Sequence, residues 1–246
     1  MPKISFQLYS ARNGGSLADT LKTLSQIGYQ NVEGYGGILG DAPALRDALD
    51  ANGLTMPTAH IALEDIENDP VAQIDIAKTL GIKAIFAPHI AEDLRPTDVE
   101  GWKAFAQRLV EAGRPIRDAG IDFGWHNHDF ELVNIGGTTS LDLIAQASEE
   151  TKLELDTGWV LRSGGDPLRF IADYGPQVIA AHIKDIAPLG ENMGEDGWSD
   201  VGHGIVDWAP ILDALSRIDA RLVLEHDNPS EVTRFAKRSF AAVSEF

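Results

Sequence analysis

Four pairs of polar residues in the second half of the chain have the types and the spacing for metal chemistry. The members of each pair are separated by one residue, and the pairs are His126/His128, Glu154/Asp156, His182/Lys184 and Glu225/Asp227. A period of two places both members of a pair on the same face of a β-strand. Charges that point into a folded interior are costly unless they are paired or bound to a cation. Four such pairs on consecutive strands therefore favour a common site over isolated polar residues.

The donor types of these pairs indicate which chemistry the site would support. Carboxylate oxygens and neutral imidazole nitrogens together suit a divalent ion such as Mn²⁺, Mg²⁺, Co²⁺ or Zn²⁺. Such an ion polarises a carbonyl or hydroxyl and stabilises an enediolate, while a flanking carboxylate or imidazole moves a proton. The pattern therefore indicates chemistry next to a ketone. Because the chain has no cysteine, a thiolate nucleophile, a Cys-ligated metal and a disulfide framework are excluded.

The elements that must position these pairs are eight short apolar segments that alternate with longer amphipathic ones. The predicted strands cover residues 4–10, 31–35, 56–61, 84–89, 122–128, 153–159, 178–185 and 221–227. The segments between them are predicted as helices, with start signals at Ser16, Asp41, Asp69, Thr97, Thr138, Asp166, Asp207 and Ser230. The matching stop signals are Gly28, Gly53, Gly81 and Gly120.

Eight strand–helix pairs in 246 residues favour an α/β fold with one closed (β/α)₈ barrel, the TIM barrel. No linker rich in Pro, Gly or Ser separates two domains, so we expect a single domain over residues 1–246. An open doubly wound sheet is the alternative, but the first turn, residues 10–15, is not a GxGxxG fingerprint. Catalysis in such barrels occurs at the carboxyl ends of the strands, where the four polar pairs lie.

The charge of the chain bears on its partners. With 20 Lys+Arg and 38 Asp+Glu the formal net charge is −18, which opposes nucleic-acid binding because phosphate contacts supply most of that affinity. No apolar run approaches the roughly 20 residues of a membrane span. The first ten residues lack the basic and long apolar regions of a signal peptide. We therefore expect a cytoplasmic protein with a small-molecule substrate and neither nucleic acid nor membrane as partner.

Six stretches of the sequence resemble the xylose isomerase-like TIM-barrel superfamily of sugar phosphate isomerases and epimerases. They are GWHNHDFEL at 124–132, LELDTGWV at 153–160, GGDP at 164–167, AHIKD at 181–185, GHGIVDW at 202–208 and VLEHD at 223–227. The resemblance covers essentially the whole chain, and the order of the pieces makes it specific. It implies one divalent ion bound by Glu, Asp, His and Glu at the ends of the late strands.

The resemblance assigns three metal ligands directly, namely Asp156, His182 and Glu225. The first ligand is open, because many members have Glu-Asn-His on the fifth strand where this chain has HNH at 126–128. Strand alternation favours His126. Glu131 keeps the family's carboxylate ligand type, as the similar inosose dehydratase branch does, and we expect Glu131 to be the ligand. His128 is then a substrate-binding or acid/base residue.

The resemblance implies an isomerase or epimerase of a sugar or keto-sugar, with Mn²⁺ as the favoured ion. The expected catalytic residues are Glu225, His128, His126 and Lys184, and the expected substrate contacts are His60, His89, Glu33 and Trp159. Sugar 3-epimerases use two opposed Glu ligands, a pair that His126 would break. An inosose or keto-sugar dehydratase or lyase is therefore the alternative, and a non-catalytic sugar-binding barrel is a third hypothesis.

Two further expectations concern a related fold and a loop. An endonuclease IV-like nuclease has the same fold but requires a His three residues after the sixth-strand Asp. This chain has Trp159 there, so we do not expect that activity. The Gly-rich acidic segment 189–198 is predicted to be either a mobile lid over the barrel mouth or an acidic loop without that role. Association of the barrel into a homo-oligomer through its helices is also compatible with the resemblance.

Overall fold

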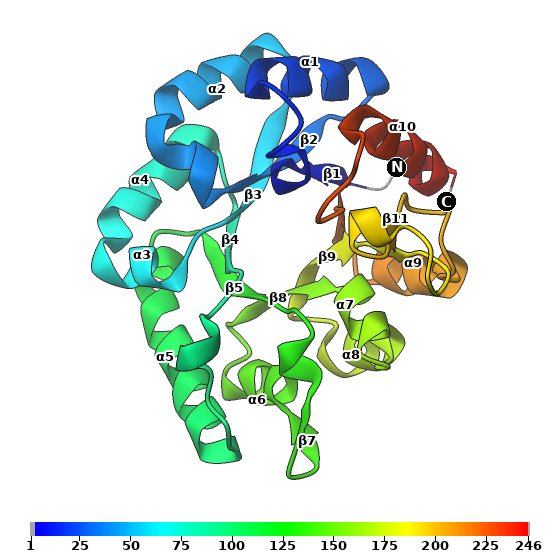
Figure 1. Ribbon diagram of the computed structural model, residues 1–246. Helices are drawn as coiled ribbons and strands as arrows, with labels where there is room; N and C mark the ends of the chain where they lie inside the picture. The colour runs from blue at the N-terminus through cyan, green and yellow to red at the C-terminus, as the bar shows by residue number, and fades with distance from the viewer. Residues whose placement is uncertain (1–2, 246) are drawn as a thin grey trace.

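The computed structural model describes residues 3–245 and contains a closed barrel of parallel strands surrounded by helices (Figure 1). Around the barrel the strand order is β1-β12-β9-β8-β5-β4-β3-β2. These strands are β1 Ile4–Gln7, β2 Asn31–Tyr35, β3 Thr55–His60, β4 Ala84–Ala87, β5 Asp122–His126, β8 Lys152–Asp156, β9 Val178–Ile183 and β12 Arg221–Leu224. The predicted TIM barrel is confirmed.

The helices lie around the outside of the barrel (Figure 1). They are α1 Leu17–Ile27, α2 Ala42–Ala51, α3 Leu63–Asn68, α4 Pro70–Leu80, α5 Val99–Asp118, α6 Ser140–Ala147, α7 Thr157–Arg162, α8 Pro167–Tyr174, α9 Trp208–Arg217 and α10 Val232–Ser244. Two small ribbons extend the loops: β6 Asn134–Ile135 with β7 Thr138–Thr139, and β10 Asp185–Ile186 with β11 Trp198–Ser199. Short 3₁₀ turns are η1 Leu8–Ala11, η2 Gly36–Asp41, η3 Glu92–Leu94, η4 Phe130–Leu132 and η5 Met193–Glu195.

Several strands end earlier than the apolar pattern predicts, because their last polar side chains cap the next helical turn. Gln7 ends β1 and accepts a hydrogen bond from Tyr9 N, which begins η1. Asp156 ends β8 and accepts from Trp159 N, which begins α7. Capping of this kind satisfies the free N–H groups of a helix start, and it fixes polar side chains at the carboxyl rim of the barrel.

The predicted helix starts are close to the observed ones. Side-chain caps form at Ser16, Asp41, Asp69 and Asp166, whereas the caps Asp98, Thr139 and Glu231 follow the predicted residue by one position. Gly28 and Gly81 end α1 and α4 with φ of 119° and 78°. This left-handed conformation favours glycine because it has no Cβ.

Two apolar regions hold the barrel together. The larger fills the space between strands and helices and includes Phe6, whose ring packs on Tyr29 and Phe235. A small one, Ala84, Phe86 and Ala180, forms a separate cluster. Within residues 3–245, none of the helices combines the length and the apolar character needed to cross a membrane.

Candidate metal centre

The carboxyl ends of four neighbouring strands bring His126, Asp156, His182 and Glu225 together. One nitrogen or oxygen of each side chain lies within 4.8 Å of the others, and all four side chains are buried. They come from β5, β8, β9 and the residue that follows β12, which are adjacent in the barrel. We call this set the upper cluster because it lies toward the mouth formed by the strand ends.

Asp156 is held by two local contacts that do not involve its Oδ2. Its Oδ1 accepts from Trp159 N at 2.8 Å, and its own N–H donates to Asn127 Oδ1 at 3.0 Å. Its Oδ2 lies 3.9 Å from His126 Nε2 and 4.0 Å from His182 Nδ1. Burial raises the pKa of the Asp156 carboxyl to about 6. Asp156 Oδ2 therefore faces two imidazole nitrogens, as well as the Lys184 ammonium.

Lys184 neutralises part of the negative charge at the upper cluster. Its Nζ donates to Asp227 Oδ1 at 2.7 Å and to Glu225 Oε2 at 3.1 Å, and it lies 3.5 Å from Asp156 Oδ2. Burial alone lowers the pKa of Lys184, but the charges of these three carboxylates outweigh burial and raise it above its usual range. The side chain is therefore a buried, permanently charged ammonium.

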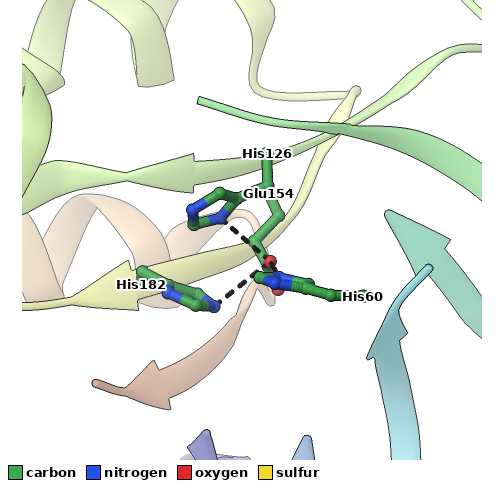
Figure 2. Close-up of side chains that lie close together, drawn as sticks. All are labelled: His60, His126, Glu154 and His182. Carbon is green, nitrogen blue, oxygen red and sulfur yellow. Dashed lines mark hydrogen bonds and ion pairs between the residues drawn. The ribbon is translucent and has the colours of Figure 1, made fainter. Parts of the chain in front are cut away.

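A second set of donor atoms surrounds Glu154, which precedes Asp156 by two residues on β8 and so lies deeper in the barrel. Figure 2 shows this set. Donor atoms of His60, His126, Glu154 and His182 lie within 4.8 Å of one another, and we call this set the lower cluster. Glu154 Oε2 lies 2.5 Å from His60 Nε2, 3.1 Å from His126 Nδ1 and 3.2 Å from His182 Nε2. Glu33 Oε1 lies 2.7 Å from His182 Nε2. Two histidines thus belong to both clusters.

The upper cluster fits a divalent ion better than the lower one. It offers two carboxylates and two imidazoles, which is a common donor set for these ions. A neutral imidazole has one free lone pair, so His126 and His182 cannot serve both clusters at once. Burial, followed by the charge of His182, lowers the pKa of His126 to about 3, which keeps this ring in the neutral form that binds a metal.

Glu131, the expected first ligand, lies apart from both clusters. It is fully buried in η4, where Oε1 accepts from Trp125 Nε1 at 2.7 Å and Oε2 accepts from His128 N at 2.8 Å. Burial raises the pKa of Glu131 to about 8, which favours a neutral carboxyl. The structure places His126 beside Asp156 instead. Ligand type suggested Glu131, whereas the inward alternation of β5 determines which side chain reaches the cluster.

The sequence matches the family described as xylose isomerase-like TIM barrel over residues 21–242. That range includes all four residues of the upper cluster. The chain belongs to the xylose isomerase-like TIM barrel family. The resemblance predicted from the sequence is therefore confirmed.

Three proteins illustrate what this xylose isomerase-like chain is similar to. An inosose dehydratase from Clostridium beijerinckii is 24% identical over 208 residues, which cover 71% of this chain and 69% of that protein. A sugar phosphate isomerase/epimerase from Parabacteroides distasonis has a TM-score of 0.82 at 18% identity, covering 98% of this chain and 93% of its own. The IOLI protein with a bound zinc atom has a TM-score of 0.77 at 16% identity, covering 99% of both chains. The two structures show a shared fold.

Two buried polar atoms at the mouth of this xylose isomerase-like barrel have no partner among the described residues, His128 Nδ1 and Trp159 Nε1. The centroids of the two rings lie 5.8 Å apart. Burial, followed by the charges of His126 and Lys184, lowers the pKa of His128 well below its usual range. A neutral imidazole nitrogen and an indole N–H donor are therefore buried without partners among the described residues, and the His128 ring lies 5.0 Å from that of His126 in the upper cluster.

The other expected substrate contacts divide between the mouth and the interior. The His89 ring lies 5.9 Å from that of His128, and burial, followed by the Arg95 charge, lowers its pKa. His60 and Glu33 instead contact the interior groups Glu154 and His182. The structure therefore brings His89 to the mouth but places Glu33 and His60 below the upper cluster.

The acidic segment 189–198 contacts α10 and Trp159 of the site. Asn192 Nδ2 donates to Trp198 O at 2.9 Å within the segment, and Glu195 pairs with Arg234 of α10 at 2.9 Å. The Trp198 ring packs edge-on against Trp159 at 4.9 Å. Glu195 and Trp198 thus attach the second half of the segment to the barrel, and its action as a lid stays a prediction.

Two residues with structural roles at the site received no assignment from the sequence. Asn127 accepts the Asp156 N–H, and Glu154 contacts three histidines. The signal for Glu154 was its i−2 spacing from Asp156, which places both on the inner face of β8. The signal for Asn127 was its position between two candidate histidines, but its partner could not be inferred from that.

Proposed function

We propose that this chain is a metal-dependent lyase that removes water from an inosose or a related keto-sugar. The sequence alone made the isomerase the first expectation and the dehydratase its alternative. The dehydratase has better support because similar proteins, such as that of Clostridium beijerinckii, are inosose dehydratases. The observation that carries the proposal is His128 Nδ1, a buried imidazole nitrogen that has no partner among the described residues, on a ring 5.0 Å from that of His126.

The upper cluster is the proposed metal site, with His126, Asp156, His182 and Glu225 as ligands. Mn²⁺ is our first choice, and Zn²⁺ is a second because the similar IOLI protein contains a zinc atom. When bound, the ion supplies positive charge to the ketone oxygen of the substrate and so acidifies the neighbouring C–H bond. The remaining steps belong to residues of the chain.

His128 is the proposed base. Its free Nδ1 takes the proton from the carbon next to the ketone, and the C–H electrons form an enolate. The enolate expels the hydroxyl of the next carbon, and the proton held by His128 passes to that oxygen, so that water leaves. General acid–base catalysis by one imidazole is consistent with this proton balance.

Lys184 and Trp159 have supporting roles in the proposal. The buried ammonium of Lys184 lies 4.9 Å and 4.7 Å from the ring centroids of Trp159 and Trp198. Its positive charge favours an oxyanion that develops nearby. We propose that the buried, unpartnered indole N–H of Trp159 donates to a substrate hydroxyl once substrate is bound, and that its ring packs against a sugar face. His89 is placed to contact the same substrate.

Epimerisation has less support because Glu225 is a poor base in this environment. Burial raises its pKa, but the charges of Lys184 and His182 outweigh burial and hold the pKa of Glu225 well below its usual range. A carboxylate held ionised in this way takes a proton reluctantly. The sugar 3-epimerases use two Glu ligands as bases, whereas the proposed ligands here pair Glu225 with His126, which is not a carboxylate.

The test is reconstitution of chelator-treated protein with Mn²⁺, Co²⁺, Zn²⁺ or Mg²⁺, followed by incubation with inososes and keto-sugars in D₂O. We expect metal-dependent loss of one water from a substrate, seen by mass spectrometry, and we expect Asp156→Asn to lack it. An isomer formed without loss of water would support the epimerase instead. Absence of both turnover and α-deuteration with every metal would contradict metal-dependent catalysis.

A further inference from the structure

Glu154 contacts both histidines of the upper cluster through the same oxygen, Oε2 (Figure 2). On the basis of the proposed metal-dependent function, we propose that Glu154, together with Glu33, is a positioning residue for these ligands. By accepting His126 Nδ1–H and His182 Nε2–H, the two carboxylates direct the opposite nitrogens, His126 Nε2 and His182 Nδ1, toward the ion. The two ligands would thus bind through different ring nitrogens.

The His126 ring is oriented by contacts on its two sides. Its Nδ1 lies 3.1 Å from Glu154 Oε2, and its Nε2 lies 3.9 Å from Asp156 Oδ2. Turning the ring over would place a carbon against the Glu154 carboxylate, which is unfavourable in a buried site. The acceptor below therefore selects the nitrogen that faces the metal ligands above.

The His182 ring is oriented in the opposite sense. Its Nε2 lies 2.7 Å from Glu33 Oε1 and 3.2 Å from Glu154 Oε2, whereas its Nδ1 lies 2.8 Å from Glu225 Oε2. Gln7 Nε2 donates to the same Glu33 oxygen at 2.7 Å and keeps that carboxylate in place. A metal-bound histidine commonly donates its other N–H to a carboxylate, which fixes its tautomer.

The burial of Glu154 is the reason to assign it this role. Its side chain is fully buried, and within the described residues Oε1 has no hydrogen-bond partner. Three imidazoles surround Oε2, with the His60 ring stacked on that of His182 at 5.3 Å. A buried carboxylate is costly unless its charge is paired and hydrogen-bonded. Orienting two metal ligands with one oxygen accounts for its presence.

The first experiment is a crystal structure of the Zn²⁺-loaded wild-type protein. We expect the zinc to contact Nε2 of His126 and Nδ1 of His182. A zinc ion bound to His126 Nδ1 and His182 Nε2, within the lower cluster, would overturn the inference while leaving metal binding intact. Failure of the wild-type protein to bind zinc or any other divalent ion would instead contradict the proposed function.

The second experiment compares Zn²⁺ affinities of two variants with a matched control. Glu154→Leu removes the acceptor, and we expect affinity to fall by about 10- to 100-fold. Glu154→Gln keeps an acceptor oxygen for the histidines, and we expect a smaller loss. Glu131→Gln makes the same change at a buried carboxyl outside both clusters and should retain nearly wild-type affinity.

The pattern across these variants distinguishes positioning from general damage. Equal losses in Glu154→Gln and Glu131→Gln, or wild-type affinity in a folded Glu154→Leu protein, would overturn the inference. If Glu154→Leu does not fold, the ligating nitrogens in the wild-type crystal structure and the Glu154→Gln affinity still decide it.

Discussion

The indole N–H of Trp125 donates to Glu131 Oε1 at 2.7 Å, and this bond holds the expected ligand Glu131 outside the upper cluster. Trp125 points outward into the layer between strands and helices, where its ring packs against Phe105 at 5.2 Å. Glu131 is bonded to that outward side chain, whereas His126, the next residue on the strand, points inward. The outer layer therefore retains the carboxylate, and the barrel interior receives the imidazole.

Replacement of His126 tests this division directly. We expect His126→Ala to weaken Zn²⁺ binding by at least about 10-fold, because it removes a proposed ligand from the upper cluster. His89→Ala is the matched control, since it removes an imidazole at the next strand end without removing a proposed ligand. Isothermal titration of both variants measures the difference, and equal zinc affinities would refute the ligand assignment.

The pH dependence of stability tests the environment of Glu131. Its pKa is raised to about 8 by burial, so the folded state holds a proton that the unfolded chain releases near its ordinary value. The stabilisation is complete below that ordinary value and is lost as pH rises through about 8. Relative to Glu131→Gln, the wild-type protein should lose up to about 1.4 kcal/mol per pH unit across this window.

Urea unfolding of metal-free protein at several pH values measures that difference. The chelator prevents pH-dependent metal binding from contributing to the slope. If the difference in unfolding free energy between wild type and Glu131→Gln did not change with pH, Glu131 would not retain its proton in the folded protein.

Lys184 should matter most to stability when no metal is bound. Lys184→Met leaves Asp156, Glu225 and Asp227 without their shared cation, and removing one partner of a buried charge set costs about 3–5 kcal/mol. Added Zn²⁺ would replace part of that positive charge, so it should raise Tm more in the variant than in wild type. A metal-free Lys184→Met protein as stable as wild type would contradict this account.

The sequence predicts the barrel and most of the candidate site for one physical reason. Alternation along a strand is a local property, so Asp156, His182 and Glu225 could be assigned to inward positions without coordinates. Glu131 could not, because its partner Trp125 Nε1 is recognised only once the turn after β5 is placed. Contacts across the barrel could also not be predicted from the sequence. Glu154, for example, contacts His60, which is 94 residues away in sequence.

The last prediction concerns His128 as the base. His128→Gln should lower kcat by about 10²- to 10⁴-fold with little change in Zn²⁺ affinity, because its ring is outside the upper cluster. Trp159→Phe keeps the aromatic ring but removes the free N–H, so it should raise KM more than it lowers kcat. Burial and the charges of His126 and Lys184 hold the pKa of His128 below its usual range, and a bound cation would lower it further. The base therefore stays unprotonated at the ordinary histidine pKa of about 6.5, and wild-type kcat/KM should decline only below that pH. Steady-state kinetics with the substrate that loses water measure the effects of both substitutions and of pH. A His128→Gln enzyme with wild-type kcat would exclude this residue as the base.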